Sequence, residues 1–354
     1  MNHPARLDAL RSRLAAERVE CLLVTSLANI FYLSGFTGSA GMLLVDERRS
    51  ILFTDGRYTL QAAEEARGSQ VVIPRSGALK AAAGRLGRYR RAGFEASADY
   101  RTWRQLREQA GAGRLRPLEN VVEQLRLVKD DDELERIRRS VALNSRAFQQ
   151  TVRRIRPGVR EVEVAAELEY RMRLMGAERP AFETVVAGGP RSAMPHARAS
   201  ARPLGENEVV VLDHGAIRSN SASDMTRTVH LGAAGRRARA LYQVVLEAQQ
   251  RAVAAVRAGA LCSAVDRAAR EHIRGCGFGR YFTHSTGHGL GIEVHEIPRL
   301  ARRDKTKLPA GAVITIEPGI YVPGIGGFRI EDVAVVREWG AEVLTTTPRA
   351  LLEL

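Results

Sequence analysis

Two segments of this sequence place an acidic residue at the end of an apolar run and a second one at a symmetric distance beyond a turn. In EVVVLDHGAIRSNSASDMTRTVHLG, Asp213 follows four apolar residues directly, and Asp224 lies eleven positions later. The midpoint falls at Arg218–Ser219, inside a polar stretch typical of a turn. Because aspartate is depleted in strands, its presence on both sides of a hairpin needs a specific reason.

The reason that we infer is a bound cation. In an antiparallel hairpin, residues equidistant from the turn face each other with Cβ atoms about 5 Å apart, so we expect Asp213 and Asp224 to lie opposite each other. Two carboxylates at that distance repel each other unless a cation lies between them. A single aspartate at a strand end is more often a capping or turn residue, but a symmetric pair favours a cation site.

The C-terminal region repeats this arrangement in AVITIEPGIYVPGIGGFRIEDVAVV. Glu317 ends a run rich in β-branched residues, Glu331 lies fourteen positions later, and the midpoint is Gly324. One such hairpin is compatible with chance, but two in one domain predict a shared site.

A histidine-rich segment adds nitrogen donors. FTHSTGHGLGIEVHEIPR, residues 282–299, contains three of the eight histidines of the chain, namely His284, His288 and His295. The alternating glycines disfavour a helix, and with it a helical zinc site built on histidines four residues apart. We expect a strand that supplies one imidazole ligand, with glycines that let a substrate approach the backbone. Any one of these histidines, taken alone, would more often be a hydrogen-bonded core residue.

Four carboxylates and one imidazole form a set of hard oxygen ligands with one nitrogen, which suits Mn, Co, Fe or Zn. Four negative charges balance two divalent cations. Two ions about 3.5–4 Å apart can orient a carbonyl group and generate a hydroxide nucleophile near neutral pH. We therefore predict two divalent metal ions per chain, with Mn favoured and Co or Zn as alternatives.

Length and pattern indicate two domains. At 354 residues the chain is too long for one ordinary core. Alternating strand and helix patterns favour an α/β domain over residues 1–128, and we place a second domain over residues 129–354. Its first helix begins at one of the three aspartates 130–132, which can cap it. Further helices are expected over residues 5–17, 236–257 and 261–274.

Composition argues against several classes of protein. No run of about 18 apolar residues occurs, so we expect no membrane span. The N-terminal MNHPARLDALRSRL lacks the apolar core of a secretory signal. Cys21, Cys262 and Cys276 are few, odd in number and far apart, which fits free thiols in a reducing compartment. We expect a cytoplasmic protein.

The net charge of +14 raises the question of nucleic-acid binding. Of the 54 basic residues, 50 are arginine, and they are dispersed through the chain among Glu and Ala. No zinc-finger or RNP pattern occurs, so we expect no nucleic-acid partner.

Taken together, these segments resemble the pita-bread metallopeptidases, peptidase family M24. The similarity in order and spacing is carried by LDHGAIRSNSASDMTRTVHLG, HSTGHGLGIEVHEIPR, ITIEPGIY and GGFRIEDV. YLSGFTGSAG and FTDGRYTLQA resemble the creatinase-type N-terminal domain of the proline-specific branch, which includes aminopeptidase P and prolidase. The resemblance implies an α/β creatinase-like domain over residues 1–128 and an α+β pita-bread catalytic domain over residues 129–354.

The resemblance also implies a role for each matching position. Asp213 would hold one metal ion, and Asp224 and Glu331 would bridge both ions. His288 and Glu317 would complete the ligands of the second ion, and Glu317 would transfer protons as well.

Five further positions match active-site residues of the branch. His196 and His295 would contact the substrate around the scissile bond, and His284 and Arg329 match further active-site residues. Arg299 resembles an arginine that some prolidases place near the substrate carboxylate; the alternative for Arg299 is a solvated surface arginine.

The activity implied by the resemblance is hydrolysis of the bond before a proline. That bond is a tertiary amide without an N–H group, so peptidases that need an N–H contact fail on it. We favour an Xaa-Pro aminopeptidase acting on short peptides with proline in second position, with a dipeptide-restricted Xaa-Pro dipeptidase (prolidase) as the alternative. A homodimer is also implied. The sequence departs from the branch at Asn220 and Ser221, where Gly-Tyr is usual.

Two other classes remain as alternatives: a metal-free hydrolase on the same scaffold, like creatinase, and a non-catalytic binding module. Both predict substituted ligand positions, whereas all five are present here.

Overall fold

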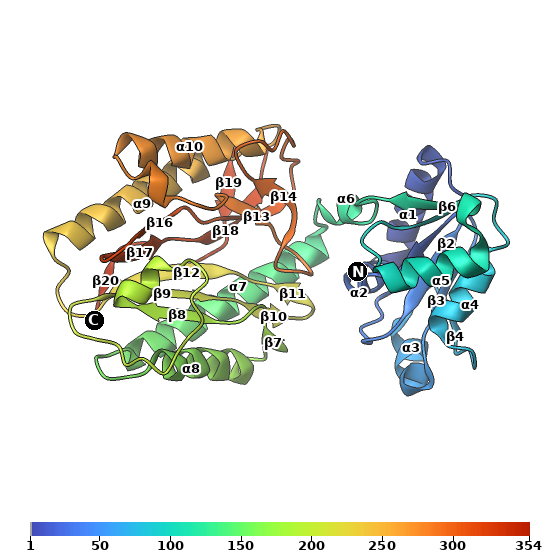
Figure 1. Cartoon of the computed structure of the whole chain (residues 1–354), viewed down its shortest axis with the longest axis horizontal. Coiled ribbons are helices and arrows are strands. Elements are labelled where there is room, and N and C mark those ends of the chain that lie inside the picture. The colour runs from blue at the N-terminus through green and yellow to red at the C-terminus, as the bar shows by residue number, and fades with distance from the viewer. Residues whose placement is uncertain (1) are drawn as a thin grey trace. The chain divides into compact units, whose positions relative to one another are not determined.

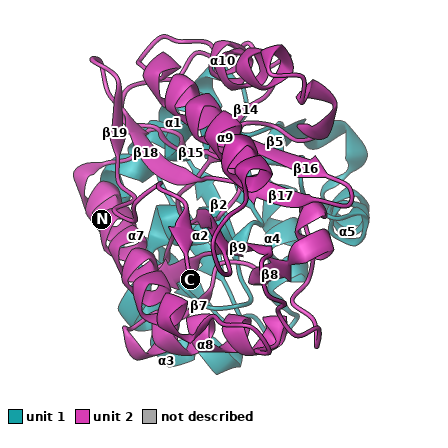
Figure 2. Cartoon of the chain, turned by 90° about the vertical axis from the view of Figure 1, so that its left-hand side faces the viewer, with its two compact units in different colours: residues 1–126 teal, residues 127–354 magenta. Residues whose placement is uncertain are grey.

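The computed structural model describes residues 2–354, which divide into two compact units, residues 2–126 and residues 127–354 (Figures 1 and 2). No helix in the described part of the chain combines the length and the apolar character needed to cross a bilayer.

Unit 1 is built on a mixed sheet with the strand order β4-β3-β2-β1-β5-β6. Strands β1, β5 and β6 run parallel to one another, whereas β2 is antiparallel to its neighbours β1 and β3. Its strands are β1 (Cys21–Val24), β2 (Met42–Asp46), β3 (Ser50–Phe53), β4 (Gln70–Val72), β5 (Ala92–Glu95) and β6 (Leu115–Leu118).

The helices of unit 1 cover this sheet, and α4 and α5 pack together against one of its faces. The continuously buried runs of β1 and β3 are typical of strands covered on both faces. Its helices are α1 (His3–Ala16), α2 (Leu27–Ser34), α3 (Thr59–Glu65), α4 (Ala78–Leu86), α5 (Tyr100–Ala110) and α6 (Glu123–Arg126). The expected helix over residues 5–17 is therefore confirmed as α1.

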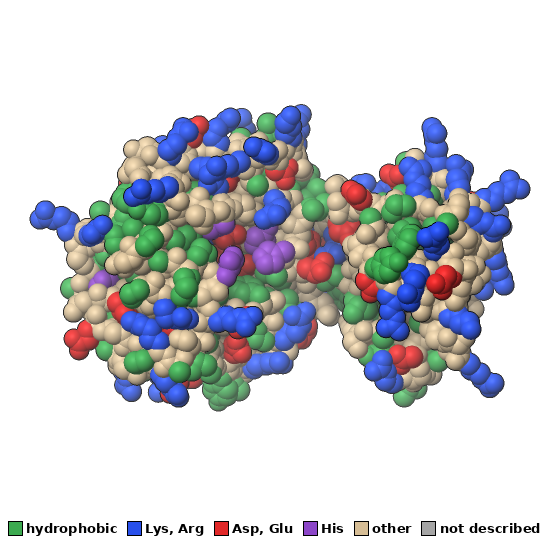
Figure 3. All heavy atoms as spheres, viewed as in Figure 1, with side chains coloured by type: hydrophobic (Ala, Val, Ile, Leu, Met, Phe, Trp, Pro, Cys, Tyr) green, Lys and Arg blue, Asp and Glu red, His purple; other side chains and the backbone are tan. Residues whose placement is uncertain are grey.

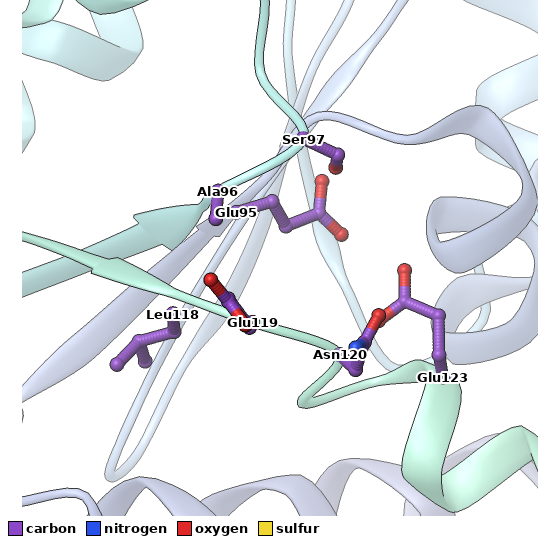
Figure 4. Close-up of a pocket in the computed structure, with 7 residues that line it drawn as sticks. All are labelled: Glu95, Ala96, Ser97, Leu118, Glu119, Asn120 and Glu123. Atoms are coloured by element: carbon purple, nitrogen blue, oxygen red, sulfur yellow. The ribbon is translucent and has the colours of Figure 1, made fainter. Parts of the chain in front are cut away.

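An acidic cavity of about 220 Å³ lies beside the carboxyl ends of β5 and β6 in unit 1 (Figure 4). Its buried Glu95 accepts hydrogen bonds from the backbone N–H groups of Thr25 and Ser26, each at 2.7 Å, and from Asn29 Nδ2 at 2.6 Å. Asn29 Nδ2 also donates to Glu123, which lines the same cavity. These bonds fix the turn between β1 and α2, so we assign this cavity a structural role.

Unit 2 contains two main sheets between two pairs of helices (Figure 1). The sheet β20-β12-β9-β8 packs against α7 and α8, and the sheet β14-β13-β15-β18-β19 packs, together with the ribbon β16-β17, against α9 and α10. The helices are α7 (Asp131–Thr151), α8 (Glu161–Leu174), α9 (Arg236–Ala255) and α10 (Cys262–Gly275).

The strands of unit 2 include a small third sheet in the order β11-β10-β7. The bounds are β7 (Arg179–Pro180), β8 (Val185–Gly188), β9 (Val209–His214), β10 (Ala216–Arg218), β11 (Ser221–Ala222), β12 (Met225–His230), β13 (Gly287–Gly289), β14 (Glu296–Leu300), β15 (Val313–Ile316), β16 (Gly319–Val322), β17 (Gly326–Arg329), β18 (Asp332–Val336), β19 (Ala341–Val343) and β20 (Leu352–Glu353).

Helix α7 begins at a capping box, as the aspartates at 130–132 led us to expect. Asp130 accepts a hydrogen bond from the Glu133 N–H at 2.8 Å, and Glu133 accepts one from the Asp130 N–H at 3.1 Å. The helices expected over residues 236–257 and 261–274 are confirmed as α9 and α10.

The hairpin that carries Asp213 and Asp224 differs by two residues from the expected pairing. Thr226, not Asp224, lies opposite Asp213. The turn consists of Ser219 and Asn220, whose positive φ angles of 52° and 55° move the centre one position along the chain. The expectation that the two aspartates face each other directly is therefore wrong. Asp224 is instead a diagonal neighbour of Asp213, still close enough to share a site.

The second hairpin has the expected pairing. The ladders β15–β18 and β16–β17 share one register centred on Gly324, in which Ile316 pairs with Asp332. Glu317 and Glu331 therefore lie opposite each other at the point where the β15–β18 ladder ends and the β16–β17 ladder begins.

Gly287 and Gly289, on either side of His288, make room for neighbouring strands and not for a substrate. A Cβ at Gly287 would lie 2.0 Å from the carbonyl oxygen of Thr315, and one at Gly289 would lie 2.2 Å from that of Ile297. Both positions are buried in β13, between β14 and β15. The expectation that they admit a substrate to the backbone is wrong, because they admit the neighbouring strands.

We expect Gly287→Ala to lower the free energy of unfolding by more than about 3 kcal/mol, because the added methyl group must displace the β15 backbone. Denaturant unfolding followed by circular dichroism measures this change. The control is Gly84→Ala in α4, where a Cβ meets nothing within 4 Å and should add about 0.5–1 kcal/mol. Wild-type stability of Gly287→Ala contradicts the packing explanation.

Candidate metal centre

Three side chains from separate parts of unit 2 converge in its interior. One ligand atom each of Asp224, His288 and Glu331 lies within 4.8 Å of the other two, and all three residues are buried. Asp224 directly precedes β12, His288 is the central residue of β13, and Glu331 lies between β17 and β18. Histidine and acidic side chains gather at the centre of this unit in the space-filling view (Figure 3).

His288 is held in the form that binds a metal. Its Nδ1 lies 2.9 Å from the carbonyl oxygen of Gly289, so Nδ1 carries the proton and donates it. The lone pair of Nε2 then faces Glu317 Oε1 at 3.5 Å and Asp224 Oδ2 at 3.7 Å. Burial lowers the pKa of His288, which favours the neutral imidazole. This geometry brings Glu317 to the cluster.

Asp213 joins the cluster from β9 with one of its oxygens already engaged. Arg329 Nη2 donates to Asp213 Oδ2 at 2.5 Å. Asp213 Oδ1 and Asp224 Oδ1 are buried without a hydrogen-bond partner within the described residues. An unsatisfied buried acceptor costs about 1–3 kcal/mol, and more when it is charged, so these oxygens are suited to a cation.

The pKa values of the carboxyl groups also favour a cation among these side chains. Burial raises the pKa of Asp224 and Glu331 well above their usual range, and the neighbouring carboxylates raise it further. Burial also raises the pKa of Glu317 to about 7. Buried carboxylates this close together ionise fully only when positive charge lies among them.

These residues therefore fit two divalent metal ions. The set offers four carboxylates and one correctly oriented imidazole, which suits Mn, Co, Fe or Zn. The residues that could hold the ions are Asp213, Asp224, His288, Glu317 and Glu331.

A hydrogen-bonded chain links the carboxylates to His284. Arg329 Nε donates to Thr226 Oγ1 at 2.9 Å, and Thr226 Oγ1 donates to Glu331 Oε2 at 2.7 Å. Arg329 Nη1 donates to the Tyr321 hydroxyl at 2.6 Å, which lies 2.9 Å from His284 Nε2. Burial lowers the pKa of His284 to about 4, so its ring is neutral near pH 7.

Two members of this chain were missed by the sequence analysis. Tyr321 lies in the quoted segment ITIEPGIY, where a tyrosine in an otherwise apolar strand was a usable signal. Thr226 gave no comparable signal, because its importance comes from the register that places it opposite Asp213.

The structure also brings His295 and His196 to this region. The rings of His295 and His288 have centroids 4.5 Å apart. His196 is exposed and follows Pro195, whose carbonyl oxygen accepts a hydrogen bond from Arg329 at 3.2 Å. Both histidines therefore lie at the edge of the carboxylate cluster.

Arg299 lies on β14 directly opposite His288 on β13. Directly paired residues of antiparallel strands project from the same face, with Cβ atoms about 4.5–5.5 Å apart. Arg299 is exposed, so its guanidinium group places a positive charge that is open to solvent and that acts on His288 and His295.

The fold and the buried carboxylate–imidazole cluster define a metal-dependent hydrolase of two domains. The sequence model of metallopeptidase family M24 matches residues 135–338, and that of the creatinase/prolidase N-terminal domain matches residues 6–128. The chain belongs to metallopeptidase family M24. The expected fold class, a creatinase-like α/β domain followed by a pita-bread catalytic domain, is confirmed.

Relatives and solved structures match this chain over nearly its whole length. The Xaa-Pro dipeptidase of Pyrococcus furiosus is 36% identical over 348 residues, which cover 98% of this chain and 99% of that protein. The structure of the Xaa-Pro dipeptidase from Bacillus anthracis is 38% identical with a TM-score of 0.96, covering 100% of both chains. The X-Pro aminopeptidase from Thermotoga maritima is 37% identical with a TM-score of 0.91, covering 98% of this chain and 99% of that one.

Without metal, we expect the protein to lose stability as the pH rises from about 5 to about 8. The pKa values of Asp224, Glu317 and Glu331 are higher in the folded than in the unfolded chain, so the folded chain binds more protons in this range. Thermal unfolding in EDTA across this range measures the effect. Glu331→Gln should flatten the dependence, and saturating Mn should abolish it. A metal-free midpoint that rises with pH contradicts the explanation.

We expect Asp224→Ala to lose both metal ions and to lower peptidase activity at least about 1,000-fold, because the family resemblance implies that this buried carboxylate would be shared by both ions. Elemental analysis after Mn reconstitution and an activity assay measure the two effects. The exposed Glu338→Ala removes the same charge elsewhere and should leave both unchanged. One tightly held ion with normal turnover in Asp224→Ala would show that this carboxylate does not bridge two ions.

Proposed function

We propose that this protein is an Xaa-Pro dipeptidase that uses two divalent metal ions to hydrolyse dipeptides with proline as the second residue. The observation that carries the proposal is the full-length similarity, at 36% and 38% identity, to two proteins named Xaa-Pro dipeptidase. The sequence analysis favoured the aminopeptidase, and these relatives support its alternative better. An Xaa-Pro aminopeptidase is the second candidate, favoured by the similarity to the Thermotoga maritima enzyme.

The position of Arg299 supports a dipeptidase. A dipeptide carries its terminal carboxylate one residue beyond the scissile bond, whereas a longer peptide carries it about 3.5 Å further away for each added residue. Arg299 lies opposite His288 and is open to solvent, so its guanidinium group can pair with a carboxylate close to the reacting bond. His295, which contacts the His288 ring, would lie against the proline.

The metal ions would be held by Asp213, Asp224, His288, Glu317 and Glu331. When bound, such ions polarise the scissile carbonyl group and lower the pKa of a water molecule, and Mn is the favoured ion. Asp224 and Glu331 lie together with His288 in one buried cluster, and the family resemblance implies that these two carboxylates would be the ligands shared by both ions.

Glu317 would carry the proton. Because bound metal ions would favour the ionised form of its carboxyl group, Glu317 could take a proton from water and deliver it to the nitrogen of the leaving proline. The neutral His284, hydrogen-bonded to Tyr321, and the exposed His196 would position the substrate at either side of the bond. Arg329 would orient Asp213 through their direct hydrogen bond.

A homodimer and a cytoplasmic location complete the proposal. The dimer is supported by family resemblance. The location is supported by the cysteines, which are free at all three positions. Light scattering during gel filtration tests the dimer.

The substrate assignment is tested with matched peptides that differ by one residue. Hydrolysis of Ala-Pro and Ala-Pro-Ala is compared with Mn, Co and Zn in turn. We expect the dipeptide to be cleaved with kcat/KM at least about 100-fold higher than that of the tripeptide, because only the dipeptide places a carboxylate near Arg299. Preferred cleavage of the tripeptide establishes the aminopeptidase instead. No cleavage of either peptide with any metal rejects both.

Arg299→Ala should raise KM for the dipeptide about 10- to 100-fold with a smaller change in kcat, because it removes a charge-assisted contact with the substrate carboxylate. The control is Arg303→Ala, which removes an exposed arginine four positions along the chain and should leave KM unchanged. Equal KM values for Arg299→Ala and the wild type mean that Arg299 is only a solvated surface residue.

A further inference from the structure

A cavity of about 680 Å³ lies along α10, outside the residues assigned to the metal centre. Five arginines line it. Arg267, Arg270 and Arg274 lie three and four residues apart on one face of α10, Arg280 follows the helix, and Arg302 follows β14. Basic side chains are grouped over the part of unit 2 in which α10 is drawn (Figures 1 and 3).

Most of this positive charge lacks a carboxylate partner, although Arg280 donates a hydrogen bond to the Tyr281 hydroxyl at 2.6 Å. Arg270 pairs with Asp266 through two hydrogen bonds of 2.7 and 2.8 Å, and Arg274 lies 3.9 Å from Glu271. These are the acidic residues of the lining, so five guanidinium groups face two carboxylates. Three guanidinium groups form no ion pair with a carboxylate of the described residues: Arg267, Arg280 and Arg302.

The floor of the cavity is already ordered. Arg270 donates to the carbonyl oxygens of Phe282 at 3.0 Å and His284 at 2.7 Å, and its guanidinium carbon lies 4.0 Å from the centre of the Phe282 ring. Asp266 accepts a hydrogen bond from the Thr286 hydroxyl at 2.9 Å. A ligand that reaches Arg270 therefore meets a side chain that is already fixed, which lowers the entropy cost of binding.

The character of the lining restricts the ligand. Among the described residues that line the cavity, none is aromatic or large and aliphatic; beyond the arginines and the two acids there are only serine and glycine. Single-stranded nucleic acids are usually bound with aromatic rings on which bases stack, and most peptide sites offer apolar contacts; this lining has neither. Planar guanidinium groups match the oxygens of phosphate groups through paired hydrogen bonds.

We propose that this cavity is a binding site for a phosphate-bearing anion, for which inorganic pyrophosphate is a suitable probe. Its phosphate oxygens pair with Arg267, Arg280 and Arg302, and Arg270 forms the floor of the site. The bound anion lies against the residue that holds the backbone of His284, and so next to the segment that leads to His288 in the metal centre.

The test is calorimetric titration of the metal-loaded protein with sodium pyrophosphate at constant ionic strength. The double variant Arg267→Gln/Arg302→Gln removes two exposed arginines from the rim of the cavity. The matched control Arg236→Gln/Arg237→Gln removes the same charge from the exposed start of α9. Because a charge-assisted hydrogen bond contributes about 1.5–3 kcal/mol, the cavity variant should bind at least about tenfold more weakly, and the control should match the wild type.

Each outcome decides the proposal. Pyrophosphate can also chelate metal ions from the protein, and this releases or absorbs heat. Because that contribution is the same in the wild type and in both variants, the proposal is judged on the difference in pyrophosphate affinity between them. Unchanged thermal unfolding and dipeptidase activity confirm that the cavity variant is folded, because neither exchanged arginine belongs to the metal centre. If both variants bind pyrophosphate equally more weakly than the wild type, the binding is general charge attraction and the proposed site is wrong. If neither variant changes the affinity for pyrophosphate, the proposed site is also wrong.

Discussion

The mutual repulsion of buried carboxylates is the constraint on which the catalytic unit depends. Asp213 and Asp224 come from one hairpin and Glu331 from a segment more than 100 residues later, and their burial together is unfavourable until positive charge lies among them. Arg329 supplies one such charge through its hydrogen bond to Asp213. Divalent ions would neutralise the remaining negative charge of the carboxylates. The bound ions would therefore link the two sheets of unit 2 as well as activate a substrate.

The sequence predicts those parts of this site that depend on local symmetry and on residue type. Glu317 and Glu331 were paired correctly because Gly324 marks the centre of their turn unambiguously. The Asp213–Asp224 pairing was wrong by two positions, since the polar run between them offers several possible turns. Only the structure shows that Ser219 and Asn220 adopt positive φ.

Contacts between segments that lie far apart in the chain could not be predicted from the sequence alone. The bond between Arg329 and Asp213 joins residues 116 positions apart, and Tyr321 acquires its place between Arg329 and His284 only when two ladders share one register. The role of Gly287 was misassigned for the same reason, because the atom that excludes a side chain there belongs to a strand distant in the chain.

The close packing around β13 also determines where substrate range can change. With carbonyl oxygens pressed against Gly287 and Gly289, the strand that carries His288 tolerates almost no variation. New preferences for the residue before proline, whether they arise by natural divergence or in a mutant library, should therefore come from exposed positions at the border of the site. The loop that carries His196 and the solvent-facing side of β14 are the natural places to randomise.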